Sequence, residues 1–297
     1  MKISCCWKYA IAKYGYPPSL PDTYKALDEM AGLGFGHAEL EGVREENLRI
    51  VYNERERLKR RCDDLGLAIV NFRPVLPDLV HPEKSRRIQA LDLFKLAVEV
   101  ATFFGCETIQ TNSFTPPLEF VGEIPYADPL ASGQCYRVKV DPAFRWDDLW
   151  GWVTDSIGAC ADEADRASLR LCLEPRAGEI VSNTDSLLRL IDAVEADNLG
   201  AVLDTCHQHA QKEILPLSVE KLNGRVYAVH VSDSDGQTDR QLALGRGTVD
   251  WDGLFLALKK HGFSGFVGVD VGAVPDVDAQ IRESKTYLEE LAGRLSM

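Results

Sequence analysis

The most informative segment of the sequence reads Leu203-Asp204-Thr205-Cys206-His207-Gln208-His209. The apolar run 200–203 ends here at the Asp204 carboxylate, and His207 follows three residues later. Three other apolar runs also end at a side chain that can bind a metal: Glu174, His230 and Asp270. In an α/β barrel the carboxyl ends of the parallel strands share one mouth, where active sites form. The four endings therefore predict a ring of ligands at the mouth of a parallel barrel.

Short apolar runs alternate with amphipathic segments along the whole chain. The predicted strands are 2–6, 36–40, 67–71, 107–111, 169–174, 200–204, 225–230 and 265–270. Between them lie segments such as 84–104, in which apolar residues recur at helical spacing. Strands separated by helices favour right-handed crossovers and a parallel sheet. No GxGxxG motif follows the first strand, as a doubly wound dinucleotide-binding fold would require. Eight such units in 297 residues predict one domain, 1–297, folded as a single closed (β/α)8 TIM barrel.

One segment, 112–144, interrupts this alternation after the fourth strand. It contains several prolines and the aromatic residues Phe114, Phe120, Tyr126 and Tyr136, which argue against disorder. Loops of this length are usually functional. Its position on the active-site mouth predicts either a lid or an oligomer contact.

Charge and cysteine content limit the partners and the compartment. The chain has 33 basic and 46 acidic residues, for a net charge of −13. This balance argues against binding to nucleic acid or to an anionic membrane. No apolar stretch approaches the roughly 18 residues of a membrane span, and the N-terminus lacks the apolar core of a signal peptide. The eight cysteines form no CxxC pair, so we expect reduced thiols in a cytoplasmic protein.

The predicted ligand set is Glu174, Asp204, His230 and Asp270. Taken singly, a strand-end aspartate is more often a helix cap and a histidine more often structural. Their joint placement favours one divalent metal ion. Three carboxylates and one imidazole make a hard, mostly oxygen site, which favours Mn²⁺, with Mg²⁺, Co²⁺ or Zn²⁺ as alternatives.

Four motifs carry a family resemblance: Leu173-Glu174-Pro175, Asp204-Thr205-Cys206-His207, His230-Val231-Ser232-Asp233 and Gly245-Arg246-Gly247-Thr248-Val249-Asp250-Trp251. Together with Leu33-Gly34-Phe35 before Glu39, they resemble the xylose isomerase-like TIM barrel superfamily of sugar isomerases, epimerases and AP endonucleases (family 2). The resemblance implies that the four predicted ligands bind one metal and that Glu174 and Asp270 also move the proton. It further implies that His207 contacts the substrate and that Glu39 lies near the rim as a substrate contact.

Two departures from the family patterns narrow the function. The epimerases end the eighth strand in glutamate, whereas this chain has Asp270, which is one methylene shorter. A small misplacement of a catalytic base is costly, so a simple two-carboxylate epimerisation is in question. Endonuclease IV needs further histidines, but the third strand ends at Asn71 and Ala228 replaces the aspartate two residues before His230.

Several other residues are candidates for the site. Arg176, Arg246 and Trp7 are predicted substrate contacts, although Arg176 could equally form a surface ion pair and Trp7 could pack in the core. The remaining candidates are Lys8 as a proton donor, Asp233 as an orienting partner of His230, and Tyr136 and Arg137 as residues that close over the ligand. His209 is expected to face solvent.

The first functional hypothesis is a metal-dependent isomerase or epimerase of a sugar or keto-sugar, acting through an enediolate with carboxylate acid–base catalysis. We expect a small-molecule substrate and a homo-oligomer. The runner-up is a lyase, either an inosose- or dehydroshikimate-type dehydratase or an enzyme eliminating the aglycone of a 3-keto glycoside. A third hypothesis is a metal-binding subunit of a hetero-complex. The early chemistry is shared, so the ligand set does not separate isomerase from lyase.

Overall fold

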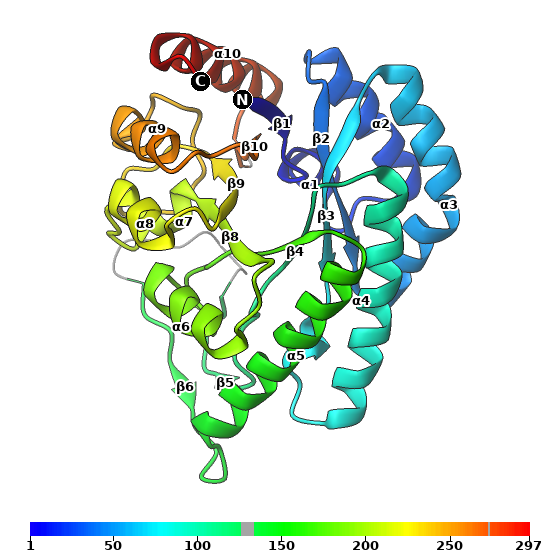
Figure 1. Cartoon of the computed structure of the whole chain (residues 1–297), viewed down its shortest axis with the longest axis vertical. Coiled ribbons are helices and arrows are strands. Elements are labelled where there is room, and N and C mark those ends of the chain that lie inside the picture. Colours follow the sequence, from blue (N-terminus) through cyan, green and yellow to red (C-terminus); the bar gives the residue numbers. More distant parts are fainter. Residues whose placement is uncertain (126–133, 273) are drawn as a thin grey trace.

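The computed structural model describes residues 1–125, 134–272 and 274–297. Eight parallel strands close into a barrel in the order β1-β10-β9-β8-β7-β4-β3-β2, so the predicted (β/α)8 barrel is confirmed (Figure 1). The barrel strands are β1 Lys2–Cys5, β2 His37–Val43, β3 Ala68–Val75, β4 Thr108–Thr111, β7 Arg170–Leu173, β8 Leu199–Asp204, β9 Val226–Val231 and β10 Phe266–Val269. Each overlaps one predicted strand.

Helices form an outer ring around these strands (Figure 1). They are α1 Lys8–Tyr14, α2 Leu20–Gly32, α3 Arg44–Leu65, η1 Pro77–Val80, α4 Lys84–Phe104, α5 Trp146–Arg166, α6 Thr184–Val194, α7 Thr205–Ala210, α8 Leu215–Leu222, α9 Trp251–Lys260 and α10 Val277–Leu295. Several begin at capping side chains: Asn183 accepts from the Ser186 amide and Asp250 from the Gly253 amide. Within the described residues, none of these helices is both long and apolar enough to cross a bilayer.

Alternation along the strands places the site on an apolar floor. Cys172, Val202 and Ala228 each precede a predicted ligand by two residues, so they share its face of the strand. With Val70 and Phe266 they form a buried cluster separate from the main core. The main core lies between the strands and the helices.

Strands β2 and β3 extend further than predicted. They pair in register up to Val43 opposite Val75, whereas the predicted strands stopped at 40 and 71. The extension carries Glu41 and Arg73 into the mouth of the barrel.

The long segment after β4 contains a two-stranded antiparallel hairpin, β5 Glu119–Phe120 and β6 Val138–Lys139. Tyr136 contacts Phe120 edge to face. A Cβ atom at Gly178, in the turn after β7, would lie 2.9 Å from Pro125 and 3.5 Å from Tyr136. The segment therefore packs against the active-site mouth. Its predicted roles as lid or oligomer contact stay predictions, and Tyr126 lies outside the described residues.

Candidate metal and substrate site

The four predicted ligands come from four neighbouring strands and line one cavity. Glu174 directly follows β7, Asp204 ends β8, His230 lies in β9 and Asp270 directly follows β10. All four side chains are buried and face the same cavity. Glu174, Asp204 and His230 each offer a ligand atom within 4.8 Å of the others. Asp270 faces the cavity but lies outside this tight group of three.

Asp204 is held in place by the helix that follows it. Its Oδ1 accepts a hydrogen bond of 2.8 Å from the backbone amide of His207 and so caps α7. The second carboxylate oxygen does not take part in this cap. The cap and the predicted ligand function thus use different oxygens of one residue.

His230 lies between two carboxylates. Its Nδ1 is 2.7 Å from Glu174 Oε1, and its Nε2 is 3.1 Å from Glu39 Oε2. Burial alone lowers the pKa of His230, but the two carboxylates outweigh this effect and raise that pKa well above its ordinary value. Burial raises the pKa of Glu174, yet the hydrogen bond and the charge of His230 lower the net pKa of this carboxyl. The two carboxylates therefore stabilise a proton on the His230 ring in the metal-free protein, at the place where a cation would bind.

Asp270 has a different environment. The Cys6 thiol donates a hydrogen bond to its carboxylate, and Gln241 Nε2 donates to its Oδ2. Burial raises the pKa of Asp270 to about 6, with Asp204 contributing and His230 opposing. This carboxyl therefore exchanges a proton near neutral pH more readily than an ordinary aspartate.

His207 and Arg176 lie together on the same cavity. Arg176 Nε donates to His207 Nε2 over 3.3 Å, and Arg176 Nε is 3.7 Å from Glu174 Oε2. His207 Nδ1 is 3.4 Å from Asp239 Oδ2. Burial lowers the pKa of His207, but Asp204 and Asp239 raise it above its ordinary value. Both side chains line the cavity in which a substrate would bind.

Some lining residues were missed because they lie beyond the predicted strand ends. Arg73 donates to Glu41 Oε1 over 3.1 Å and to Asn112 Oδ1 over 3.2 Å. Burial lowers the pKa of Arg73, but Glu41 and Glu174 raise it above its ordinary value, so the guanidinium is charged. The only signal in the sequence was spacing: Glu41 lies two positions after Glu39, and Arg73 lies two positions after Asn71. Cys6 and Gln241 were missed as neighbours of Asp270 because they come from other parts of the chain.

Three predicted roles do not match the structure. Glu39 is not at the rim: it is buried inside the barrel and accepts from His230 and from Asn71 Nδ2 at 2.9 Å. Trp7 packs in the hydrophobic core and is absent from the described cavity lining, because its side chain lies among apolar neighbours. Arg246 forms an ion pair with Glu283 at 2.6 Å on the protein surface, since its glycine-flanked loop points away from the cavity.

Two secondary predictions also change. Asp233 does not contact His230. It accepts from the Gly245 and Val249 amides and from Trp251 Nε1, so it shapes the loop that precedes α9. Glu39, and not Asp233, contacts the His230 ring and can orient it. Lys8, by contrast, lines the cavity as its predicted role requires.

The cavity has a volume of about 370 Å³. Its lining combines the carboxylates and imidazoles with three cationic side chains and an apolar wall. The cationic side chains are Lys8, Arg73 and Arg176. The apolar and aromatic wall comprises Ile11, Tyr16, Val75 and Phe114. A pocket of this size with a few convergent polar groups is typical of a small-molecule site.

Comparison with known proteins identifies the family. The family model for the xylose isomerase-like TIM barrel matches residues 27–291. Fructoselysine 3-epimerase of Escherichia coli O157:H7 is 24% identical over 149 residues, 49% of this chain and 52% of that protein. The chain thus spans about half the length of this curated relative. The solved 3-keto-D-glucoside 4-epimerase of E. coli has a TM-score of 0.75 at 18% identity, covering 98% of this chain and 99% of that one. The IOLI protein, solved with a zinc atom, has a TM-score of 0.70 at 17% identity, covering 99% of each chain. The chain belongs to the xylose isomerase-like TIM barrel family.

Proposed function

We propose that the protein is a divalent-metal-dependent isomerase or epimerase of a sugar or keto-sugar. The observation that carries this proposal is the buried group Glu174, Asp204 and His230, with Asp270 and His207 facing the same cavity. The epimerase named among the relatives and the epimerase among the similar structures support it.

The donor set fits a divalent ion. Two carboxylates and one imidazole converge within 4.8 Å, and His230 already occupies the centre of a negative environment. Asp270 would complete the set from the end of β10, the strand next to that of His230. These oxygen-rich ligands favour Mn²⁺, with Mg²⁺, Co²⁺ or Zn²⁺ as alternatives. When bound, the metal would polarise the carbonyl of the substrate.

The remaining chemistry belongs to the side chains of the chain. Glu174, whose pKa is lowered, is ionised and would remove a proton from the carbon beside the carbonyl. Asp270, whose pKa is raised to about 6, would return a proton to a carbon of the substrate. His207 and Arg176 would hold substrate oxygens, and Lys8 would stabilise developing negative charge. Two carboxyl groups with pKa values shifted apart suit an acid and a base.

Hydrogen exchange with solvent tests the proposal directly. The Mn²⁺-loaded protein is incubated in D₂O with ketohexoses and 3-keto glycosides, and the recovered sugars are analysed by NMR. We expect deuterium at a carbon beside the carbonyl, together with an isomerised or epimerised product. Metal-loaded protein that exchanges no hydrogen with any of these sugars would contradict the proposed function.

A second candidate, a lyase, is favoured by one observation. Asp270 is short and is held by both Cys6 and Gln241, which restricts its reach to a substrate carbon. Elimination needs only one carboxylate base and a proton donor for the leaving group, for which Lys8 and His207 are available. The same NMR experiment separates the two functions, because a lyase yields an unsaturated sugar and releases water or the aglycone.

A further inference from the structure

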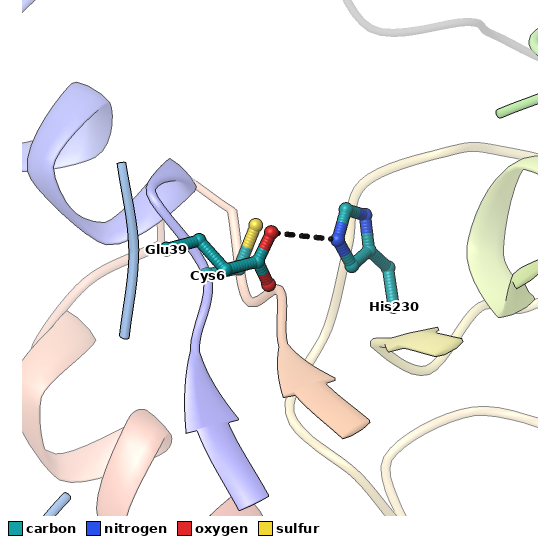
Figure 2. Close-up of side chains that lie close together, drawn as sticks. All are labelled: Cys6, Glu39 and His230. Carbon is teal, nitrogen blue, oxygen red and sulfur yellow. Dashed lines mark hydrogen bonds and ion pairs between the residues drawn. The ribbon is translucent and has the colours of Figure 1, made fainter. Parts of the chain in front are cut away.

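A second group of side chains of metal-ligating type lies beside Nε2 of the His230 ring. Cys6 follows β1, Glu39 lies in β2 and His230 in β9, and their side chains face one another (Figure 2). Each offers a ligand atom within 4.8 Å of the others, and all three residues are buried. We propose that Cys6, Glu39 and His230 form an alternative metal position, selective for soft or borderline ions such as Cd²⁺ and Zn²⁺.

Glu39 has one carboxylate oxygen beside the His230 ring and a second that is unused. Its Oε2 accepts from Asn71 and His230, but its Oε1 is buried and has no hydrogen-bond partner in the described part of the chain. A Cβ atom at Gly268 would lie only 2.4 Å from Oε1 and 3.4 Å from Ser4 Oγ. The Ser4 hydroxyl is likewise buried without a partner among the described residues. Buried polar atoms in native proteins are normally satisfied, and a cation would satisfy this carboxylate.

The approach and the geometry suit a metal ion. Cys6 and His230 both line the cavity, so an ion that enters from the mouth reaches them directly. Tetrahedral zinc with bonds of about 2.0 to 2.3 Å places its ligand atoms about 3.3 to 3.8 Å apart. Glu39 Oε2 and His230 Nε2 are 3.1 Å apart. Binding requires a small rearrangement and the release of two protons to solvent, one from the Cys6 thiol and one from His230 Nε2, which donates to Glu39 in the metal-free protein.

The ligand types decide which ion binds where. The group at Nδ1 of His230 adds only carboxylate oxygens, from Glu174 and Asp204, and favours Mn²⁺ or Mg²⁺. The group at Nε2 adds a thiolate, which favours soft and borderline ions. A neutral imidazole has a lone pair on one nitrogen and a proton on the other. One ring therefore serves one ion at a time, and the two positions compete.

Cadmium titration tests the proposal in the full-length protein. A Cys135→Ser background removes the one exposed cysteine. Ultraviolet difference spectra report formation of a cadmium–thiolate bond. We expect this absorption in the background protein and in the matched control Cys5→Ser, but not in Cys6→Ser. Excess Mn²⁺ should weaken apparent Cd²⁺ binding, and Glu39→Gln should weaken it at least tenfold while keeping the thiol.

X-ray absorption of the zinc-loaded background protein gives a second readout that needs no variant at the site. One sulfur neighbour at about 2.3 Å is expected. Absence of a thiolate band and of a sulfur neighbour would overturn the proposal, as would an undiminished cadmium band in Cys6→Ser. Both readouts measure binding alone, so they remain informative even if the proposed sugar chemistry fails. If that chemistry holds, Cd²⁺ should inhibit the Mn²⁺ enzyme less after Cys6→Ser.

Discussion

Replacing Asp204 by asparagine separates the metal-binding role of this residue from its structural role. Asn and Asp are about equally good helix caps, and the amide oxygen can still accept from the His207 amide, now 2.8 Å from Oδ1. We therefore expect the free energy of unfolding of the metal-free protein to change by less than about 0.5 kcal/mol. The melting temperature should shift by no more than about 2 °C.

The same substitution removes a negative ligand from the group Glu174, Asp204 and His230. Loss of a residue that merely orients a ligand costs about 10- to 100-fold in metal affinity, so loss of the ligand itself should cost at least about 100-fold. This factor corresponds to about 2.7 kcal/mol.

Calorimetric titration with Mn²⁺ and elemental analysis after dialysis measure the loss. Asp250→Asn is the matched control, because Asp250 caps α9 by accepting from the Gly253 amide at 3.0 Å and does not line the cavity. The control should bind Mn²⁺ like the wild type. Full Mn²⁺ occupancy with unchanged affinity in Asp204→Asn would refute the ligand assignment.

Three further predictions follow from the same structure. His207→Ala should keep most of the Mn²⁺ affinity but lower turnover at least tenfold, since its ring faces the substrate cavity; a parallel loss of metal affinity would contradict this role. Mn²⁺ affinity should fall as the pH drops below about 6, because protons then occupy Asp270, whose pKa is raised to about 6. In Mn²⁺ titrations repeated over a series of pH values, Asp270→Asn should lack this step. If Asp270 had the ordinary pKa of an aspartate, the step would appear only near pH 4. Gly265→Ala should destabilise the barrel by about 1 to 3 kcal/mol in thermal denaturation, because its Cβ would lie 1.9 Å from the Tyr227 carbonyl oxygen. Gly32→Ala, with no atom near its Cβ, should not.

Local sequence patterns were sufficient to predict which residues end the four ligand-bearing strands. Each apolar run had to be buried, and each ended at a polar residue that could reach only the mouth of the barrel. Glu174, Asp204, His230 and Asp270 therefore meet at one cavity as the strand order requires. The caps at Asn183 and Asp250 are equally local, since a cap depends on residues within one turn.

Residues in loops and beyond the predicted strand ends could not be placed in this way. Arg246 lies in a motif next to the mouth, yet its side chain points to Glu283 on the surface. Arg73 was hidden because the pairing of β2 with β3 continues past the predicted strand ends. Glu39 could be assigned to a strand but not to its partner His230, which is 191 residues away in the chain.

The sequence by itself determined the barrel and the chemical type of its mouth, because apolar periodicity and strand-end residues act within a few positions of the chain. Only the tertiary structure decided how the two nitrogens of His230 are shared between Glu174 and Glu39, and how Cys6 and Gln241 hold Asp270. These contacts join residues from different strands and loops. Their distances depend on barrel closure and side-chain packing, which no local pattern encodes.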